Sequence, residues 1–344
     1  MNRILLSTTL TLTAATPFAL PGADLGDNPN RFSLGAHIGL NFKADFTRTP
    51  VDPGPDAAGG NHLYSDGYVR VDSSGNAGGL TWNWGYKDAS QAPGDDAMHF
   101  HAVQPDSASG YAGSSRRVGS EFFKEPQYGV ELIYQRVLGR LLPSARWGLE
   151  AAFGYTDLDL RDNRSAAGVP VTLTTDTYPL NGVVPPSAGY NGTFRGPGAL
   201  LGDTPTRDVT ADTATLTSRQ KLSGQLYTIR LGPFAEWNFT HQLSLAASVG
   251  LTLVPAVVDY DFSETATLAG GGTFQESGHS SKTKLLHGPY VSGTLRYDFS
   301  EHWGVYVGAQ FQSLTDMKQS IGGRTARLTP GPTVYGTAGI SFRF

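Results

Sequence analysis

The stretch Thr337-Ala338-Gly339-Ile340-Ser341-Phe342-Arg343-Phe344 ends the chain and decides the fold. Alternate residues share one face of a strand, so Ile340, Phe342 and Phe344 point one way and Ser341 and Arg343 the other. The last residues of a soluble domain usually fray into solvent. This strand instead runs to the final residue and finishes on an aromatic. A closed β-barrel accounts for it, because the last strand of a barrel must pair with the first.

Seven more segments show the same period of two, which predicts strands. They lie at 32–46, 128–134, 147–155, 227–239, 243–253, 291–299 and 303–311. With the terminal strand they make eight, and crossing a bilayer at a tilt takes about 9–11 residues per strand. We therefore expect an all-β fold, a closed antiparallel up-and-down barrel in which the terminal strand pairs with the segment 32–46.

The connections between these segments alternate in length. Short turns at 139–145, 240–242 and 300–302 alternate with long loops at 47–127, 161–220, 263–286 and 313–332. Outer-membrane barrels have short periplasmic turns and long extracellular loops. Tyr68–Val71 and Leu80–Tyr86 could add a hairpin to the wall and make ten strands. We expect eight, with this hairpin inside the first long extracellular loop, and keep ten as the alternative.

Composition narrows the class of protein further. The chain has 344 residues with 43 glycines and no cysteine, and it has no run of about 18 apolar residues that could form a transmembrane helix. A net charge of −4 argues against nucleic acid as a partner. Arg3, an apolar stretch at 4–12 and small residues near Ala23 predict a signal peptide at 1–23. The barrel domain is then expected at 31–344.

The face opposite the apolar stripe separates a membrane barrel from a secreted sandwich. That face is rich in Gly, Ser, Asn and Gln, and its charges balance: Lys43, Arg146, Arg230, Arg296 and Arg343 against Asp45, Glu131, Glu150, Glu236 and Asp298. Buried charges must pair, so this balance predicts an ion-paired network that plugs the lumen. Aromatic residues near the short turns predict a periplasmic girdle: Trp147, Trp237, Phe239, Phe299, Trp303 and Phe344.

The terminal strand also fits a known pattern. Thr337, Gly339, Phe342 and Phe344 match the insertion signal of bacterial outer-membrane proteins: polar, any, Gly, two of any, aromatic, any, aromatic. From Arg31 to Phe344 the chain resembles the small outer-membrane β-barrel superfamily that includes OmpA- and OmpW-type barrels. The resemblance implies a place in the outer membrane of a Gram-negative bacterium and recognition of the last strand by the barrel-assembly machinery. Because the sequence stops at the barrel, we expect no peptidoglycan-binding domain such as OmpA has.

Two acidic pairs lie where upward strands leave the membrane. Asp157 and Asp159 end one strand, and Asp259 and Asp261 end another. Such rim carboxylates could bridge divalent cations to lipopolysaccharide, although solvated carboxylates are the simpler interpretation. They faintly resemble the acidic pairs of outer-membrane aspartyl proteases, but no Asp-x-His stands at the matching strand end.

Other candidate chemistry is sparse. His99 and His101 could hold a metal together with Asp95 or Asp96, but ordinary loop histidines are commoner. His37 is expected in the polar interior of the barrel. No Ser-His-Asp arrangement, phosphate-binding glycine loop or cysteine nucleophile can be placed, so we expect neither an enzyme nor a cofactor or metal.

These observations predict a monomeric barrel that supports the envelope and binds an unidentified extracellular ligand through its loops. Loop aromatics could supply the contacts or pack the loops: Trp82, Trp84, Tyr86, Tyr111 and Tyr190. The alternative is a porin-like barrel that passes small solutes or hydrophobic ligands. Partners then include outer-membrane lipid and lipopolysaccharide.

Overall fold

The computed structural model describes residues 29–49, 51–106, 115–119 and 126–344. The expected signal peptide and Tyr111 lie outside these residues. Strands dominate the described chain, with two short 3-10 turns, η1 (Ala77–Gly79) and η2 (Ala89–Gln91). In this part of the chain, no helix is long and apolar enough to cross a membrane.

Eight antiparallel strands form a closed ring. In ring order they are β1 (Asn30–Leu40), β9 (Gln127–Leu142), β10 (Ala145–Pro179), β12 (Thr206–Asn238), β13 (Leu243–Leu268), β14 (Thr273–Asp298), β15 (Trp303–Gln312) and β18 (Thr333–Arg343). Each strand pairs with its neighbours, and β18 pairs with β1. The prediction of an eight-stranded up-and-down barrel is confirmed.

The chain's last strand closes the ring as expected. The pairing of β1 with β18 runs from Arg31 opposite Arg343 to Leu40 opposite Val334. Beyond it, Asn30 and Phe344 exchange two backbone hydrogen bonds, of 3.2 and 3.0 Å. The Phe344 ring also stacks on the Phe32 ring, with centroids 5.5 Å apart. Pairing therefore continues to the final residue.

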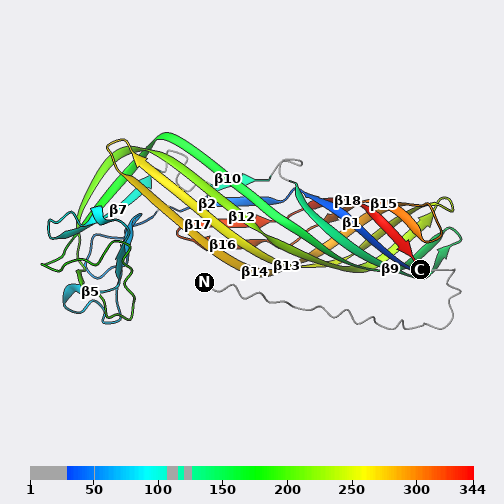
Figure 1. Cartoon of the computed structure of the whole chain (residues 1–344), viewed down its shortest axis with the longest axis horizontal. Coiled ribbons are helices and arrows are strands. Elements are labelled where there is room, and N and C mark those ends of the chain that lie inside the picture. The colour runs from blue at the N-terminus through cyan, green and yellow to red at the C-terminus, as the bar shows by residue number, and fades with distance from the viewer. Residues whose placement is uncertain (1–28, 50, 107–114, 120–125) are drawn as a thin grey trace.

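Four strands of the ring extend far beyond the other four. β10, β12, β13 and β14 have 35, 33, 26 and 26 residues, and Figure 1 shows them running on past β1, β15 and β18. A second sheet faces their extensions, in the order β16 (Met317–Ile321), β17 (Arg324–Thr329), β2 (Lys43–Arg48) and β8 (Ser115–Val118). The expected loop 161–220 is therefore mostly wall, and only 180–205 connects β10 to β12.

The segment 32–46 is two strands rather than one. Asn41 has a φ of 66°, in the left-handed region that few residues other than glycine adopt. This residue separates β1 from β2 and reverses which face points inward. In β1 the odd-numbered residues are buried, whereas in β2 the even-numbered residues are buried. The prediction that Lys43 belongs to the lumen network is therefore wrong, as is the inward placement of Asp45, which pairs outside with Arg117 at 2.8 Å.

The space between the extended strands and the second sheet is an apolar core. Its buried members come from both walls: Phe42, Ala44, Phe46, Leu158, Leu160, Leu222, Leu226, Val254, Ala256, Val258, Tyr260, Phe262, Leu286, Leu314, Met317, Ala326, Leu328 and Tyr335. We call this set the upper core. Above the membrane, the space between the two sheets is thus packed with apolar side chains, as in the core of a soluble β-protein.

A compact unit, the distal module, caps the far end and is formed by residues 51–106 and 180–205. It contains β3 (His62–Leu63), β4 (Gly67–Val69), β5 (Leu80–Thr81), β6 (Trp84–Tyr86), β7 (Ala97–Pro105) and β11 (Leu201–Gly202). β4 pairs with β6, so the hairpin expected around 68–86 lies outside the wall. Figure 1 shows the strands β5 and β7 at the end of the molecule opposite to the C-terminus.

Buried polar contacts anchor the distal module to the wall. β7 pairs with the end of β10, from Ala97 to Pro105. Tyr64 Oη donates to Asp176 at 2.6 Å, and Arg207 holds the same carboxylate through two hydrogen bonds of 2.7 and 2.6 Å. Burial and the neighbouring hydroxyl of Tyr178 raise the pKa of Tyr64, so this phenol stays protonated and donates.

Candidate functional site

The outer surface of the ring is apolar on all eight strands. Large hydrophobic side chains exposed there include Leu34, Ile38, Val130, Leu132, Leu149, Phe153, Ile229, Leu231, Val249, Leu251, Val291, Leu295, Val305, Val307 and Ile340. A soluble monomer rarely exposes a continuous apolar patch beyond a few hundred Å². Only hydrocarbon is a suitable solvent for a belt of this extent.

Aromatic side chains border this belt at both ends. All six residues expected in the girdle beside the short turns are at least partly exposed, from Trp237 at 37 % to Phe239 at 61 %. At the other end stand Tyr128, Tyr155, Tyr227 and Phe311, and the rings of Tyr155 and Tyr227 are 5.6 Å apart. Such girdles mark the two interfaces of an outer-membrane barrel. The chain is a transmembrane β-barrel of the bacterial outer membrane.

Comparisons with known proteins add distant similarities in fold. No protein-family model and no curated protein matches the chain. Three solved structures illustrate the similarity. The outer membrane protease OmpT of Escherichia coli is 13 % identical, with 92 % of this chain and 97 % of that chain covered and a TM-score of 0.32. OprG of Pseudomonas aeruginosa is 11 % identical over 90 % and 96 %, with a TM-score of 0.28. Ail of Yersinia pestis, in complex with a heparin analogue, is 10 % identical over 92 % and 99 %, with a TM-score of 0.24.

The lumen of this barrel holds its charges in two layers. The lower layer lies at the periplasmic end and comprises Arg31, Arg146, Glu236, Arg296, Asp298 and Arg343. Glu236 accepts hydrogen bonds from three guanidiniums, those of Arg31 at 2.7 Å, Arg146 at 2.6 Å and Arg296 at 3.1 Å. Asp298 accepts from Arg343 at 2.7 Å. The sequence prediction omitted Arg31, because it began the first strand at Phe32.

The upper layer comprises Glu131, Glu150 and Arg230. Arg230 donates to Glu131 at 2.7 Å and lies 3.7 Å from Glu150, and all three side chains are almost fully buried. Gln135 donates to Glu150 at 2.6 Å. His37 lies in the same interior, where its Nε2 is 2.9 Å from Thr156 Oγ1. The structure thus places every charged residue of the predicted network in these two layers except Lys43 and Asp45.

The upper core closes the interior above these two layers. Tyr335 and Phe42 meet edge to face, with centroids 6.0 Å apart, where the polar lumen ends. His37 lies directly below, with its ring 5.1 Å from Tyr335. The interior is therefore filled in sequence by ion pairs, by a polar layer and by apolar side chains.

The four rim carboxylates share one outward patch just above the membrane. β12 runs between the two pairs, because Ser223 is opposite both Asp159 and Asp259. Asp159 pairs with Arg161 at 2.5 Å, and this hydrogen bond holds the pKa of Asp159 below its usual value. Asp261 pairs with His279 at 2.7 Å. Among the described residues, no ion pair is formed by the other two carboxylates of this patch, Asp157 and Asp259.

The same patch contains cations that the sequence prediction did not single out. A surface groove of about 600 Å³ is lined by Arg161, Arg219, Lys221 and Asp261, among others. These residues face outward because the alternation of β12 continues beyond the membrane. The alternation that places these cations on one face is visible in the sequence. We predicted this segment as a loop, and inward and outward faces can be assigned only to a strand.

The two histidines considered for a metal have separate partners. His99 Nε2 is 2.8 Å from Asp95, and His101 Nδ1 is 2.6 Å from Asp66. Within the described ranges, no three His, Cys, Asp or Glu side chains cluster at metal-binding distance. His101 and Asp66 line a cleft of about 880 Å³ between the distal module and the β13–β14 turn. In the described part of the chain, the other ring nitrogen of His101 has no hydroxyl partner that could serve as a nucleophile.

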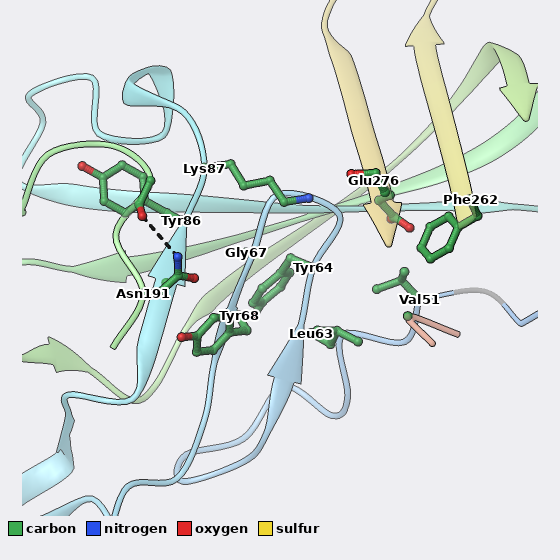
Figure 2. A pocket seen from close by; sticks show the side chains of 14 residues that line it. Val51, Leu63, Tyr64, Gly67, Tyr68, Tyr86, Lys87, Asn191, Phe262 and Glu276 are labelled. Atoms are coloured by element: carbon green, nitrogen blue, oxygen red, sulfur yellow. Dashed lines mark hydrogen bonds between the residues drawn. The ribbon is translucent and has the colours of Figure 1, made fainter. Parts of the chain in front are cut away.

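A smaller pocket of about 250 Å³ lies between the distal module and the tips of β13 and β14 (Figure 2). Tyr64, Tyr68 and Tyr86 line it from the module, and Phe262 and Glu276 line it from the two strands. Its wall combines aromatic faces with a few polar groups. Pockets that hold small ligands have this mixture.

Lys87 bridges the two sides of this pocket. Its Nζ donates to the carbonyl oxygen of Ser65 in the module at 2.6 Å and to that of Gln275 on β14 at 3.1 Å. Of the loop aromatics singled out from the sequence, Trp84 is fully buried and Tyr86 nearly so. Both pack the module, and their rings stack 5.8 Å apart.

Proposed function

We propose that this protein is a closed outer-membrane barrel that supports the envelope and presents the distal module as a binding surface. The observation that carries the proposal is the filled interior. Two layers of ion pairs occupy the lumen, and the upper core lies above them. Eight-stranded barrels have an interior just wide enough for side chains. The protein is proposed to act as a monomer without catalytic activity.

Conductance across planar bilayers tests the closed lumen. Purified protein should give no stable unitary steps above those of a detergent blank, while a general porin in the same bilayers gives steps. Stable steps from the unaltered protein would overturn the proposal and favour the alternative, passage of small solutes through a hydrated lumen.

For the binding surface, we propose a ligand with a flat apolar ring face and hydroxyl groups, such as one pyranose of a surface glycan. The pocket of about 250 Å³ has room for one such ring. Tyr68 presents its ring there while its hydroxyl donates to the Gly192 carbonyl at 2.7 Å, which fixes the ring. Aromatic side chains supply large apolar contact at little entropic cost.

Binding of the detergent-solubilised protein to a glycan array tests this ligand class. Tyr68→Ala should abolish the signal. Phe194→Ala is the matched control, since Phe194 is a 58 % exposed aromatic of the same module that does not line the pocket. Equal binding by both variants would refute the role of the pocket.

Lipopolysaccharide is the proposed partner of the outward patch above the girdle. Arg161, Arg219 and Lys221 can bind its phosphates directly, and Asp157 and Asp259 can do so through divalent cations. The double variant Arg219→Gln and Lys221→Gln should co-purify with less lipopolysaccharide than Lys318→Gln, an exposed lysine of β16. Washing with a chelator separates the two modes, because direct contacts survive it. Retention unchanged in the double variant would contradict direct binding.

The last strand is the proposed address for the barrel-assembly machinery. Phe342 and Phe344 lie beside Trp303 at the periplasmic end, and the Phe342 and Trp303 rings are 4.9 Å apart. Deleting Phe344 should slow insertion in cells. Heat-modifiable migration on gels reports the folded fraction, and an undiminished folded fraction after a pulse of synthesis would contradict this role.

A further inference from the structure

The lower layer carries more positive charge than its carboxylates can balance. It contains four arginines and two carboxylates, which leaves an excess of two positive charges. The upper layer has one arginine and two carboxylates, an excess of one negative charge. Within these two layers, five guanidiniums therefore face four carboxylates. One positive charge of the two layers is thus unmatched, and an unpaired buried charge is costly.

Unsatisfied donors locate this excess in the lower layer. Arg31 Nε, Arg146 Nε and two nitrogens of Arg296, Nε and Nη2, are buried without an acceptor. Arg31 is 5 % exposed and Arg296 is 1 % exposed. Buried N–H groups normally have a partner, so these donors point to an acceptor that the side chains of the layer do not supply. Among the described residues, no ion pair links this layer to the carboxylate of Phe344 either.

A small cavity lies among these side chains. Its volume is about 10 Å³, and Arg31, Arg146, Arg343 and Glu236 line it together with Gln135. That volume is close to the minimum for one water-sized species. The side chains of Arg146 and Arg343 are 20 % and 22 % exposed, so they give access from the periplasm.

We propose that this cavity binds one small monovalent anion of about the size of chloride. A single such ion brings the sum of the charges in the two layers to zero. It can also accept hydrogen bonds from Arg31 and Arg146, which line the cavity and whose Nε groups have no acceptor. Water could satisfy the donors but not the charge. Phosphate and sulfate are larger than chloride, and a cavity close to the minimum for one water favours the smallest anions.

Unfolding of the detergent-solubilised protein in urea tests the proposal through linkage. Chloride should stabilise the fold relative to gluconate at equal ionic strength, and each tenfold rise in chloride above its dissociation constant should raise the folding constant tenfold. Arg146→Gln should lose this dependence. The control Arg327→Gln removes the same charge and should keep the chloride dependence, because Arg327 pairs with Asp316 outside the membrane. Equal stability of the unaltered protein in both salts would overturn the proposal.

Crystals grown in bromide give a second readout that needs no variant. Bromide should appear as an anomalous peak among Arg31, Arg146 and Arg343. A peak absent from this position, or a peak without any effect of halide on stability, would overturn the proposal, since an anion that balances a buried charge must stabilise the fold.

Discussion

Glu236 and Glu131 are both buried carboxylates of the lumen, yet their removal should have very different consequences. Glu236→Gln leaves the four arginines of the lower layer with Asp298 alone, since Glu236 was shared by three guanidiniums. Breaking a buried pair so that a charge stays unmatched costs about 3–5 kcal/mol. Glu131→Gln instead removes one of two like charges beside Arg230, which keeps Glu150 at 3.7 Å. The amide oxygen of the variant can still accept from Arg230, so the loss there is roughly 1 kcal/mol.

The free energy of unfolding in urea, followed by tryptophan fluorescence in detergent micelles, measures both variants. Chloride must be held constant, because an anion in the lower layer would change the result for Glu236→Gln. The expected difference between the variants is at least about 2 kcal/mol, from the two estimates above. Equal losses, or a larger loss for Glu131→Gln, would refute the assignment of opposite excess charge to the two layers.

Three further predictions concern the wall above the membrane. Asn41→Val should cost about 1–2 kcal/mol in the same unfolding assay, because a β-branched residue opposes positive φ, while Asn41→Gly should be tolerated. A hydrogen bond to Asp261 raises the pKa of His279 above 6.5, so the contribution of this pair is present at low pH and lost as pH rises through the raised pKa. Titration by NMR should show this, and Asp261→Asn should return the pKa toward 6.5. Tyr64→Phe removes a hydrogen bond to the Asp176 carboxylate, worth about 1.5–3 kcal/mol, and should speed proteolysis of the distal module while the barrel stays intact; an unchanged cleavage rate would contradict this anchoring role.

The number of wall strands could be predicted because each crossing repeats the same local signal. A strand in contact with lipid on one face and a polar lumen on the other must alternate, and eight such segments are visible in the sequence. The pairing of the last strand with the first followed from closure alone. The short turns at 240–242 and 300–302 predicted the periplasmic end, because outer-membrane barrels have their short turns on that side.

The buried pairs of the extension could not be predicted, because they join residues far apart in the chain. Arg48 donates to Glu264 at 2.8 Å across 216 positions, and Arg324 pairs with Glu264 at 3.1 Å and with Glu276 at 2.6 Å. Their strands were taken as loops, so their faces could not be assigned. The entropic cost of closing a loop grows only slowly with its length, so distance along the chain does not exclude any pairing. Composition alone therefore does not show which charged residues will form an ion pair.

The same apolar–polar alternation continues from the membrane into the aqueous region above it, although the environment of each face changes. The strands of the wall accommodate this change in two ways. In the long strands the inward face stays inward and its composition changes. Along β13, Ser248 and Thr252 face the lumen in the membrane, whereas Val258 and Tyr260 face the upper core beyond it. The outward face changes in the opposite sense, from leucines to aspartates.

The short strands keep the composition and change the face. From Phe32 to Phe46 every even-numbered residue is apolar, and the reversal at Asn41 turns this apolar face from lipid to the upper core. A slip of one residue exchanges the two faces of a strand, so one left-handed residue is sufficient. An unbroken apolar alternation therefore does not fix the inner face of a barrel strand. The membrane ends at the level where, in the long strands, the inward face changes from serine and threonine to apolar residues and the outward face changes from leucine to aspartate.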